Sequence, residues 1–107
     1  MTVSQTELIK ALKKPAAYHN SPKTIKLIET STSLLFKADD QLYKIKKLGN
    51  EYATLAVKEV FCREECHLSQ RFNPNWPLEV LPVMEHSGEI KIGGTEGEII
   101  EYALKME

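Results

Sequence analysis

The chain has 107 residues, which is enough for one domain with a single modest core. Fourteen basic and fifteen acidic residues give a net charge of −1, so charge does not favour binding to nucleic acid or to an anionic membrane. No apolar run approaches the roughly 20 residues of a membrane span. The N-terminal residues lack the basic and apolar regions of a signal peptide. We therefore expect a globular protein of the cytoplasm.

Residues 1–22 are predicted to form a helix followed by a loop. Ser4 and Glu7 have the spacing of a capping box, in which each side chain satisfies an otherwise unpaired amide at the start of a helix. The apolar residues between positions 8 and 12 follow directly, and Pro15 suits the end of the helix.

Residues 23–107 complete the same single domain as a sheet with a second helix. A helical pattern from about Glu51 to about Phe72 has Phe61, Leu68 and Phe72 along one apolar face. Short alternating runs bounded by turn residues predict strands. These runs cover residues 25–29, 34–36, 42–46, 80–84, 90–92 and 98–102, and the last three runs supply two or three strands. The expected fold class is α+β, an antiparallel sheet with one long helix packed on it and an N-terminal helix.

Lysines interrupt the strand at residues 42–47. Because side chains alternate along a strand, Lys44 and Lys46 share one face of the sheet. One interpretation is a solvated or edge strand, in which lysines discourage aggregation. The other is that one lysine reaches across the sheet to a phosphate.

A glutamate lies on the apolar face of the long helix. Glu65 is in line with Phe61 and Leu68, and Glu64 lies at the border of that face. A glutamate in such a position is costly unless it is paired, and a lysine of the neighbouring strand is the natural partner. The alternative is an amphipathic helix whose edge glutamate extends to solvent.

Two further groups of residues have simpler interpretations. The turn Thr30–Ser33 is either a polar hairpin or a loop that donates hydrogen bonds to phosphate, although it has no glycine. Cys62, Cys66 and His67 lack the second ligand pair of a structural zinc site, so helix packing is expected instead of metal binding. Trp76, between prolines, is expected to anchor the loop after the helix.

Several segments together resemble a known family. They cover residues 27–30, 42–47, 61–68, 80–83 and 101–106, in matching order over nearly the whole chain. In this respect the chain is similar to the amino-terminal lobe of the aminoglycoside-phosphotransferase-like kinases, and most similar to a bacterial branch described as gluconate-kinase-like.

The resemblance implies a five-stranded small-lobe sheet with an αC-type helix, which together hold ATP. Lys44 would contact the phosphates, with Lys46 as the alternative. Glu65 would be the ion-pair partner of this lysine, with Glu64 as the alternative.

The resemblance also assigns two backbone segments to the nucleotide. Ser31, Thr32 and Ser33 would lie where the phosphate-covering loop runs. Glu101, Tyr102, Ala103 and Leu104 would form the hinge that meets the adenine, and the domain would end at this hinge.

Two departures from the family pattern limit the expected activity. The turn lacks the glycines that allow close approach to phosphate. The catalytic aspartate and the magnesium-binding aspartate of these kinases belong to a second lobe that this chain does not contain, so Mg²⁺ is expected only with that lobe and no catalytic residue is assigned. We expect weak ATP binding without turnover, and as partner either a C-terminal kinase lobe or a second copy. The alternative is a non-catalytic protein-interaction module that retains the fold.

Overall fold

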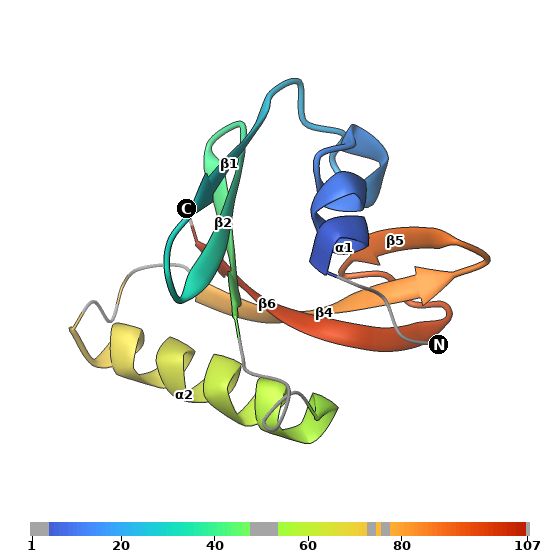
Figure 1. Ribbon diagram of the computed structural model, residues 1–107. Helices are drawn as coiled ribbons and strands as arrows, with labels where there is room; N and C mark the ends of the chain where they lie inside the picture. The colour runs from blue at the N-terminus through green and yellow to red at the C-terminus, as the bar shows by residue number, and fades with distance from the viewer. Residues whose placement is uncertain (1–4, 48–53, 73–74, 76–77, 107) are drawn as a thin grey trace.

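The structure is a computed structural model that describes residues 5–47, 54–72, 75 and 78–106 (Figure 1). Its elements in chain order are α1 (Gln5–Leu12), the 3-10 helix η1 (Pro15–Ala17), β1 (Ile25–Glu29), β2 (Ser33–Ala38), β3 (Gln41–Lys46), α2 (Leu55–Phe72), β4 (Leu78–His86), β5 (Glu89–Ile92) and β6 (Glu98–Met106). The expected α+β class is confirmed. None of the helices in these ranges is long and apolar enough to cross a membrane.

All strands belong to one curled antiparallel sheet with the order β1-β2-β3-β6-β4-β5. The prediction of five strands is wrong, because the described residues form six. The additional strand is β5, which folds back on β4 through a two-residue loop. In this loop Ser87 and Gly88 have φ values of 52° and 85°, the left-handed conformation that tight hairpins require.

The first hairpin turns are stabilised locally. Asp39 has a φ of 53° in the turn between β2 and β3. Its carboxylate accepts hydrogen bonds from the backbone amides of Thr24 (3.0 Å) and Lys23 (3.1 Å). These amides lower the pKa of Asp39. The start of β1 is thereby tied to the β2–β3 turn, which fixes how the three strands align.

The hydrophobic core lies between α1 with η1 and one face of the sheet. Phe36 and Ile45 are fully buried there, as is Leu12 from α1. The rings of Tyr18 and Tyr43 pack at a tilt with 5.1 Å between centroids. The Tyr18 hydroxyl donates a 2.6 Å hydrogen bond to the carbonyl of Leu12, so the end of α1 is held over this core.

Helix α2 lies on the opposite side of the sheet, beneath β6 and β4, as Figure 1 shows. Only Cys62 of its 18 residues is buried. The apolar face of Phe61, Leu68 and Phe72 is largely exposed to solvent, although the ring of Phe61 contacts Lys46 of the sheet. Cys62 and the polar side chains described below make the closest contacts with the sheet.

Three expectations fall outside the described residues. The predicted helix start near Glu51, the cap at Ser4 and the anchoring role of Trp76 all concern positions whose structure is not described.

Candidate functional site: a lysine-rich crevice under helix α2

Strand β3 carries the two predicted lysines to the α2 side of the sheet. Tyr43 and Ile45 of this strand are buried in the core. Because neighbouring side chains alternate, Lys44 and Lys46 project the other way, and both contact α2. The expectation that these two lysines share a face is confirmed.

The contact between Lys44 and Glu65 is the geometric centre of the site. Lys44 Nζ lies 2.7 Å from Glu65 Oε1, the distance of a charge-assisted hydrogen bond. Each side chain is about one-third exposed, at 28% and 30%. Of the two glutamates left open by the sequence, Glu65 makes this contact and Glu64 is exposed.

A second ion pair, which the sequence did not reveal, lies next to the first. Lys58 Nζ is 3.1 Å from Glu101 Oε2, so this pair joins α2 to β6. Glu101 is buried, and its carboxylate also accepts a 3.0 Å hydrogen bond from the backbone amide of Tyr102. Burial raises the pKa of Glu101, while the Tyr102 amide and Lys58 act against this rise.

A signal for the second pair was present in the sequence. Lys58, Cys62 and Glu65 have the spacing of one helical face. The apolar residues Phe61, Leu68 and Phe72 lie beside this face, and a prediction centred on them does not include Lys58.

Lys46 is the cation of the site without an ion pair in the described part of the chain. Its Nζ lies 5.3 Å from the centroid of the Phe61 ring, which is within the range of a cation–π contact. The side chain is exposed. Lys44 and Lys58 would have to weaken an ion pair in order to bind an anion, whereas Lys46 would not.

These groups line a narrow crevice between α2 and the sheet, whose residues are Lys44, Lys46, Lys58, Phe61, Cys62, Glu65, Glu101 and Tyr102. Three lysines face two glutamates there, which leaves one positive charge in excess. The enclosed volume is about 10 Å³, room for about one water molecule at most. An anionic ligand would therefore lie across the mouth of the crevice, not inside it.

The turn between β1 and β2 makes its own hydrogen bonds. The hydroxyl of Thr30 accepts hydrogen bonds from the backbone amides of Ser33 (2.9 Å) and Thr32 (3.3 Å), and Ser33 is buried. Lys47 Nζ donates to the carbonyl of Thr30 at 2.9 Å. For Ser31, Thr32 and Ser33 the phosphate-covering role stays a prediction, and two of the three amides would have to change partner to fulfil it.

Residues 101–103 lie within a strand in the structure. Strand β6 continues to Met106, and Glu101, Tyr102 and Ala103 pair with Val83, Pro82 and Leu81 of β4. The predicted last strand ended at Tyr102, so the observed strand is longer at this end. A contact between these backbone groups and adenine stays a prediction.

The cysteines behave as packing residues. Cys62 is buried, and this burial raises the pKa of its thiol to about 11. Across residues 5–47, 54–72, 75 and 78–106, no cluster of three or more His, Cys, Asp or Glu side chains is positioned to hold a metal ion.

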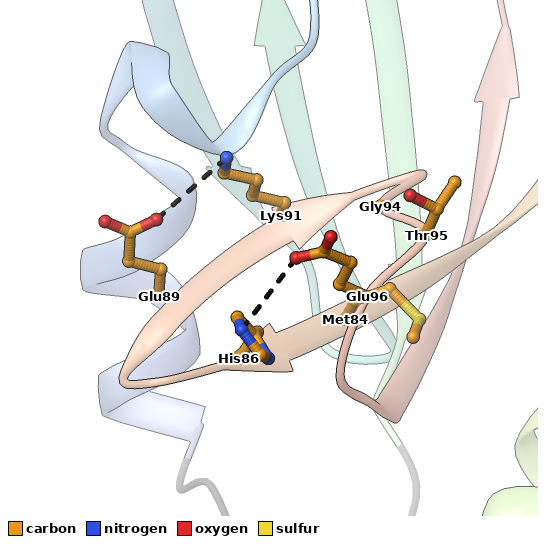
Figure 2. A pocket seen from close by; sticks show the side chains of 7 residues that line it. All are labelled: Met84, His86, Glu89, Lys91, Gly94, Thr95 and Glu96. Carbon is orange, nitrogen blue, oxygen red and sulfur yellow. Dashed lines mark ion pairs between the residues drawn. The ribbon is translucent and has the colours of Figure 1, made fainter.

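A larger cavity of about 280 Å³ lies on the β4–β5 hairpin and the loop that follows it (Figure 2). His86 Nε2 and Glu96 Oε2 are 3.8 Å apart across it, and Lys91 Nζ and Glu89 Oε2 are 3.9 Å apart. All four side chains are exposed. Size alone would favour this cavity, but it has no buried polar group to bind a ligand, so the crevice is the better candidate.

Comparison of the chain with protein-family models, curated proteins and solved structures finds no match.

Proposed function

We propose that the chain is the nucleotide-binding small lobe of a phosphotransferase-like kinase and that it does not catalyse phosphoryl transfer alone. The observation that carries the proposal is the 2.7 Å contact between Lys44 and Glu65. In this role Lys44 contacts the phosphates of ATP, and Glu65 holds the ammonium group in position. Lys46, which has no carboxylate partner in the described residues, adds a second cation at the mouth of the crevice.

The order of the elements supports this proposal. A three-stranded meander ends in the lysine strand β3, the helix α2 follows, and β6 returns beside β3. This arrangement brings a strand lysine and a helix glutamate, 21 positions apart, into contact. A solvated edge strand would not need a carboxylate partner at this position, so the pair favours the phosphate interpretation.

We propose that affinity for the nucleotide is low. The crevice encloses almost no volume, so most of a bound nucleotide would stay exposed to water. Lys44 must also divide its charge between Glu65 and a phosphate. A second lobe, which would cover the nucleotide and supply the catalytic base and the magnesium ligands, is the partner implied by this function.

The experiment is a titration of the purified chain with Mg-ATP and Mg-GTP, followed by calorimetry and by NMR chemical shifts. Saturable binding is expected, and Lys44→Ala should weaken it by at least about tenfold because a charge-assisted phosphate contact is lost. Lys91→Ala is the matched control. Lys91 lies on β5, is not among the crevice residues and makes a 3.9 Å ion pair with Glu89, so the control removes the same charge and also breaks an ion pair.

Two results would contradict the proposal. One is no saturable binding at millimolar nucleotide. The other is equal loss of binding in the Lys44 and Lys91 variants, which would indicate a non-specific attraction to positive charge.

A non-catalytic interaction module is the second candidate. The exposed apolar side chains of α2 favour it, since Phe72 is 83% exposed and Leu68 52% exposed. Under this alternative, Lys44→Ala changes stability and leaves any nucleotide response unchanged.

A further inference from the structure

Helix α2 presents its large apolar side chains to solvent. Phe61, Leu68 and Phe72 follow each other at i, i+7 and i+11, so they form one stripe along the helix, which we call the Phe61 stripe. All three side chains are exposed, and the stripe lies beside the ion-pairing residues Lys58 and Glu65, with the ring of Phe61 also in contact with Lys46 of the sheet. Exposed apolar side chains that line up along a helix are typical of an interaction surface.

Two opposite charges flank this stripe on one side. Glu64 and Arg71 are two helical turns apart, at i and i+7, and both are exposed. About 10 Å of helix separates them, which is too far for them to pair with each other. Neither makes an ion pair within the described ranges, although Arg63 and Glu59 on the same helix do pair.

We propose that a second copy of this chain covers the Phe61 stripe, with the two α2 helices antiparallel about a two-fold axis near Leu68. In an antiparallel pair the same edge of each helix faces its counterpart. Glu64 then lies opposite Arg71 of the partner subunit, and the two-fold axis repeats this contact a second time. Leu68 lies near the axis, with Phe61 and Phe72 on either side of it.

The charge order selects a second copy as the occupant. Glu64 and Arg71 lie at equal distances on either side of a midpoint of the helix. When a second, identical helix runs antiparallel about that midpoint, each charge therefore meets the opposite charge of the other helix. In a parallel pair the same edges lie on opposite sides of the interface, so neither charge would meet its complement. The stripe meets the crevice at Phe61, but the contacts proposed here use neither Lys44 nor the buried pair of Lys58 with Glu101, so the dimer requires no bound nucleotide.

The experiment is sedimentation equilibrium of the full chain from micromolar to millimolar concentration. The wild-type protein should approach twice its 12.2 kDa mass as the concentration rises. Glu64→Arg and Arg71→Glu should each weaken association by about tenfold, since both symmetric contacts change from attraction to repulsion. The double variant should restore the dimer, and so should an equimolar mixture of the two single variants, because in the mixed dimer every contact is again between opposite charges.

An apolar substitution provides the control. Leu68→Glu should abolish the dimer, whereas Ile28→Glu, which changes a similarly exposed residue on β1 (47%), should leave it unchanged. Circular dichroism of each variant checks that the fold is intact. A wild-type monomer at millimolar concentration would overturn the inference. Charge variants that weaken association without rescue in the mixture would overturn it too, as would a dimer that is indifferent to Leu68→Glu.

Discussion

The ion pair between Lys58 and Glu101 allows a quantitative test of how α2 is held on the sheet. Of the residues of α2, only Cys62 is buried, so apolar burial contributes little to its position. The Glu101 carboxylate is buried and is compensated by Lys58 and by one backbone amide. Removing the cation with Lys58→Met keeps a side chain of similar length and leaves the carboxylate with that single amide.

The expected cost is about 2 kcal/mol in the free energy of unfolding at pH 7. Breaking a fully buried pair costs roughly 3–5 kcal/mol, and breaking a surface pair costs roughly 0–1 kcal/mol. This pair lies between these limits, since the side chains of Lys58 and Glu101 are 21% and 11% exposed. A domain of this size has a total stability of about 5–15 kcal/mol, so the loss should be easily measured.

The cost should depend on pH in a defined direction. Burial already raises the pKa of Glu101 in the folded protein, and loss of Lys58 raises it further because one of the opposing causes is gone. A carboxyl group with a raised folded pKa destabilises the protein above that pKa. As the pH falls through it, the folded state takes up the proton first and the penalty disappears. The difference between variant and wild type should therefore shrink from pH 7 towards pH 5.

Urea unfolding at both pH values, followed by circular dichroism, measures this difference. Lys91→Met is the matched control, because its ion pair with Glu89 is long (3.9 Å) and exposed, and its loss should cost less than about 0.5 kcal/mol at either pH. The double variant with Glu101→Gln should recover part of the stability lost in Lys58→Met. If Lys58→Met costs no more than the control and shows no pH dependence, α2 is held by something other than this pair.

Three further predictions concern the fold. Gly97→Ala should cost more than about 3 kcal/mol in the free energy of unfolding, because φ is +98° and a Cβ would lie 2.0 Å from the carbonyl oxygen of Glu85. Gly88→Ala has open space around the new Cβ, so only its positive φ is unfavourable and the cost should be about 1–2 kcal/mol. Urea unfolding of the two variants compares these costs. Tyr18→Phe should cost about 1–2 kcal/mol by the same measurement, because its buried hydroxyl donates a 2.6 Å hydrogen bond to a main-chain carbonyl that would lose its donor. Burial raises the pKa of the Cys62 thiol to about 11, so at pH 8 it should react with iodoacetamide at least about a hundredfold more slowly in the folded protein than in urea. Mass spectrometry measures both rates, and similar rates in the two states would contradict the burial of Cys62.

The contact between Lys44 and Glu65 was predictable because two periodicities determine it. Alternation along β3 placed Lys44 on the opposite face from the buried Tyr43 and Ile45, and the helical repeat left Glu65 as the candidate closest to the presumed inner face. A carboxylate facing a lysine at this separation then follows from the cost of leaving either charge unpaired. The role of the pair towards a nucleotide does not follow from these periodicities.

The orientation of α2 could not be predicted by the same rules. A pattern of apolar residues marks the face of a helix that burial alone would favour, and in α2 it marks Phe61 and Leu68, which lie beside the residues that meet the sheet and not at the centre of the contact. The sheet beneath the helix instead carries Lys44 and Glu101, whose charges favour Lys58 and Glu65 as neighbours. Long-range complementarity between charges overrode the local apolar signal. The strand count failed for a different reason. Five strands were implied by the resemblance, whereas the alternating run at 90–92 does form a strand, β5, by pairing with β4.

The two proposals are linked through the position of α2. Lys58 and Glu65 make the ion pairs of the crevice, and the Phe61 stripe runs along the adjoining exposed edge of the helix, with Phe61 lining the crevice as well. A second copy that binds the stripe only when the helix lies against the sheet would stabilise that position, and so would hold Glu65 against Lys44. Linkage then requires the converse effect, with nucleotide strengthening the dimer by the same factor by which the dimer strengthens nucleotide binding. Equal dimer affinity with and without saturating nucleotide would mean that the crevice and the Phe61 stripe act independently.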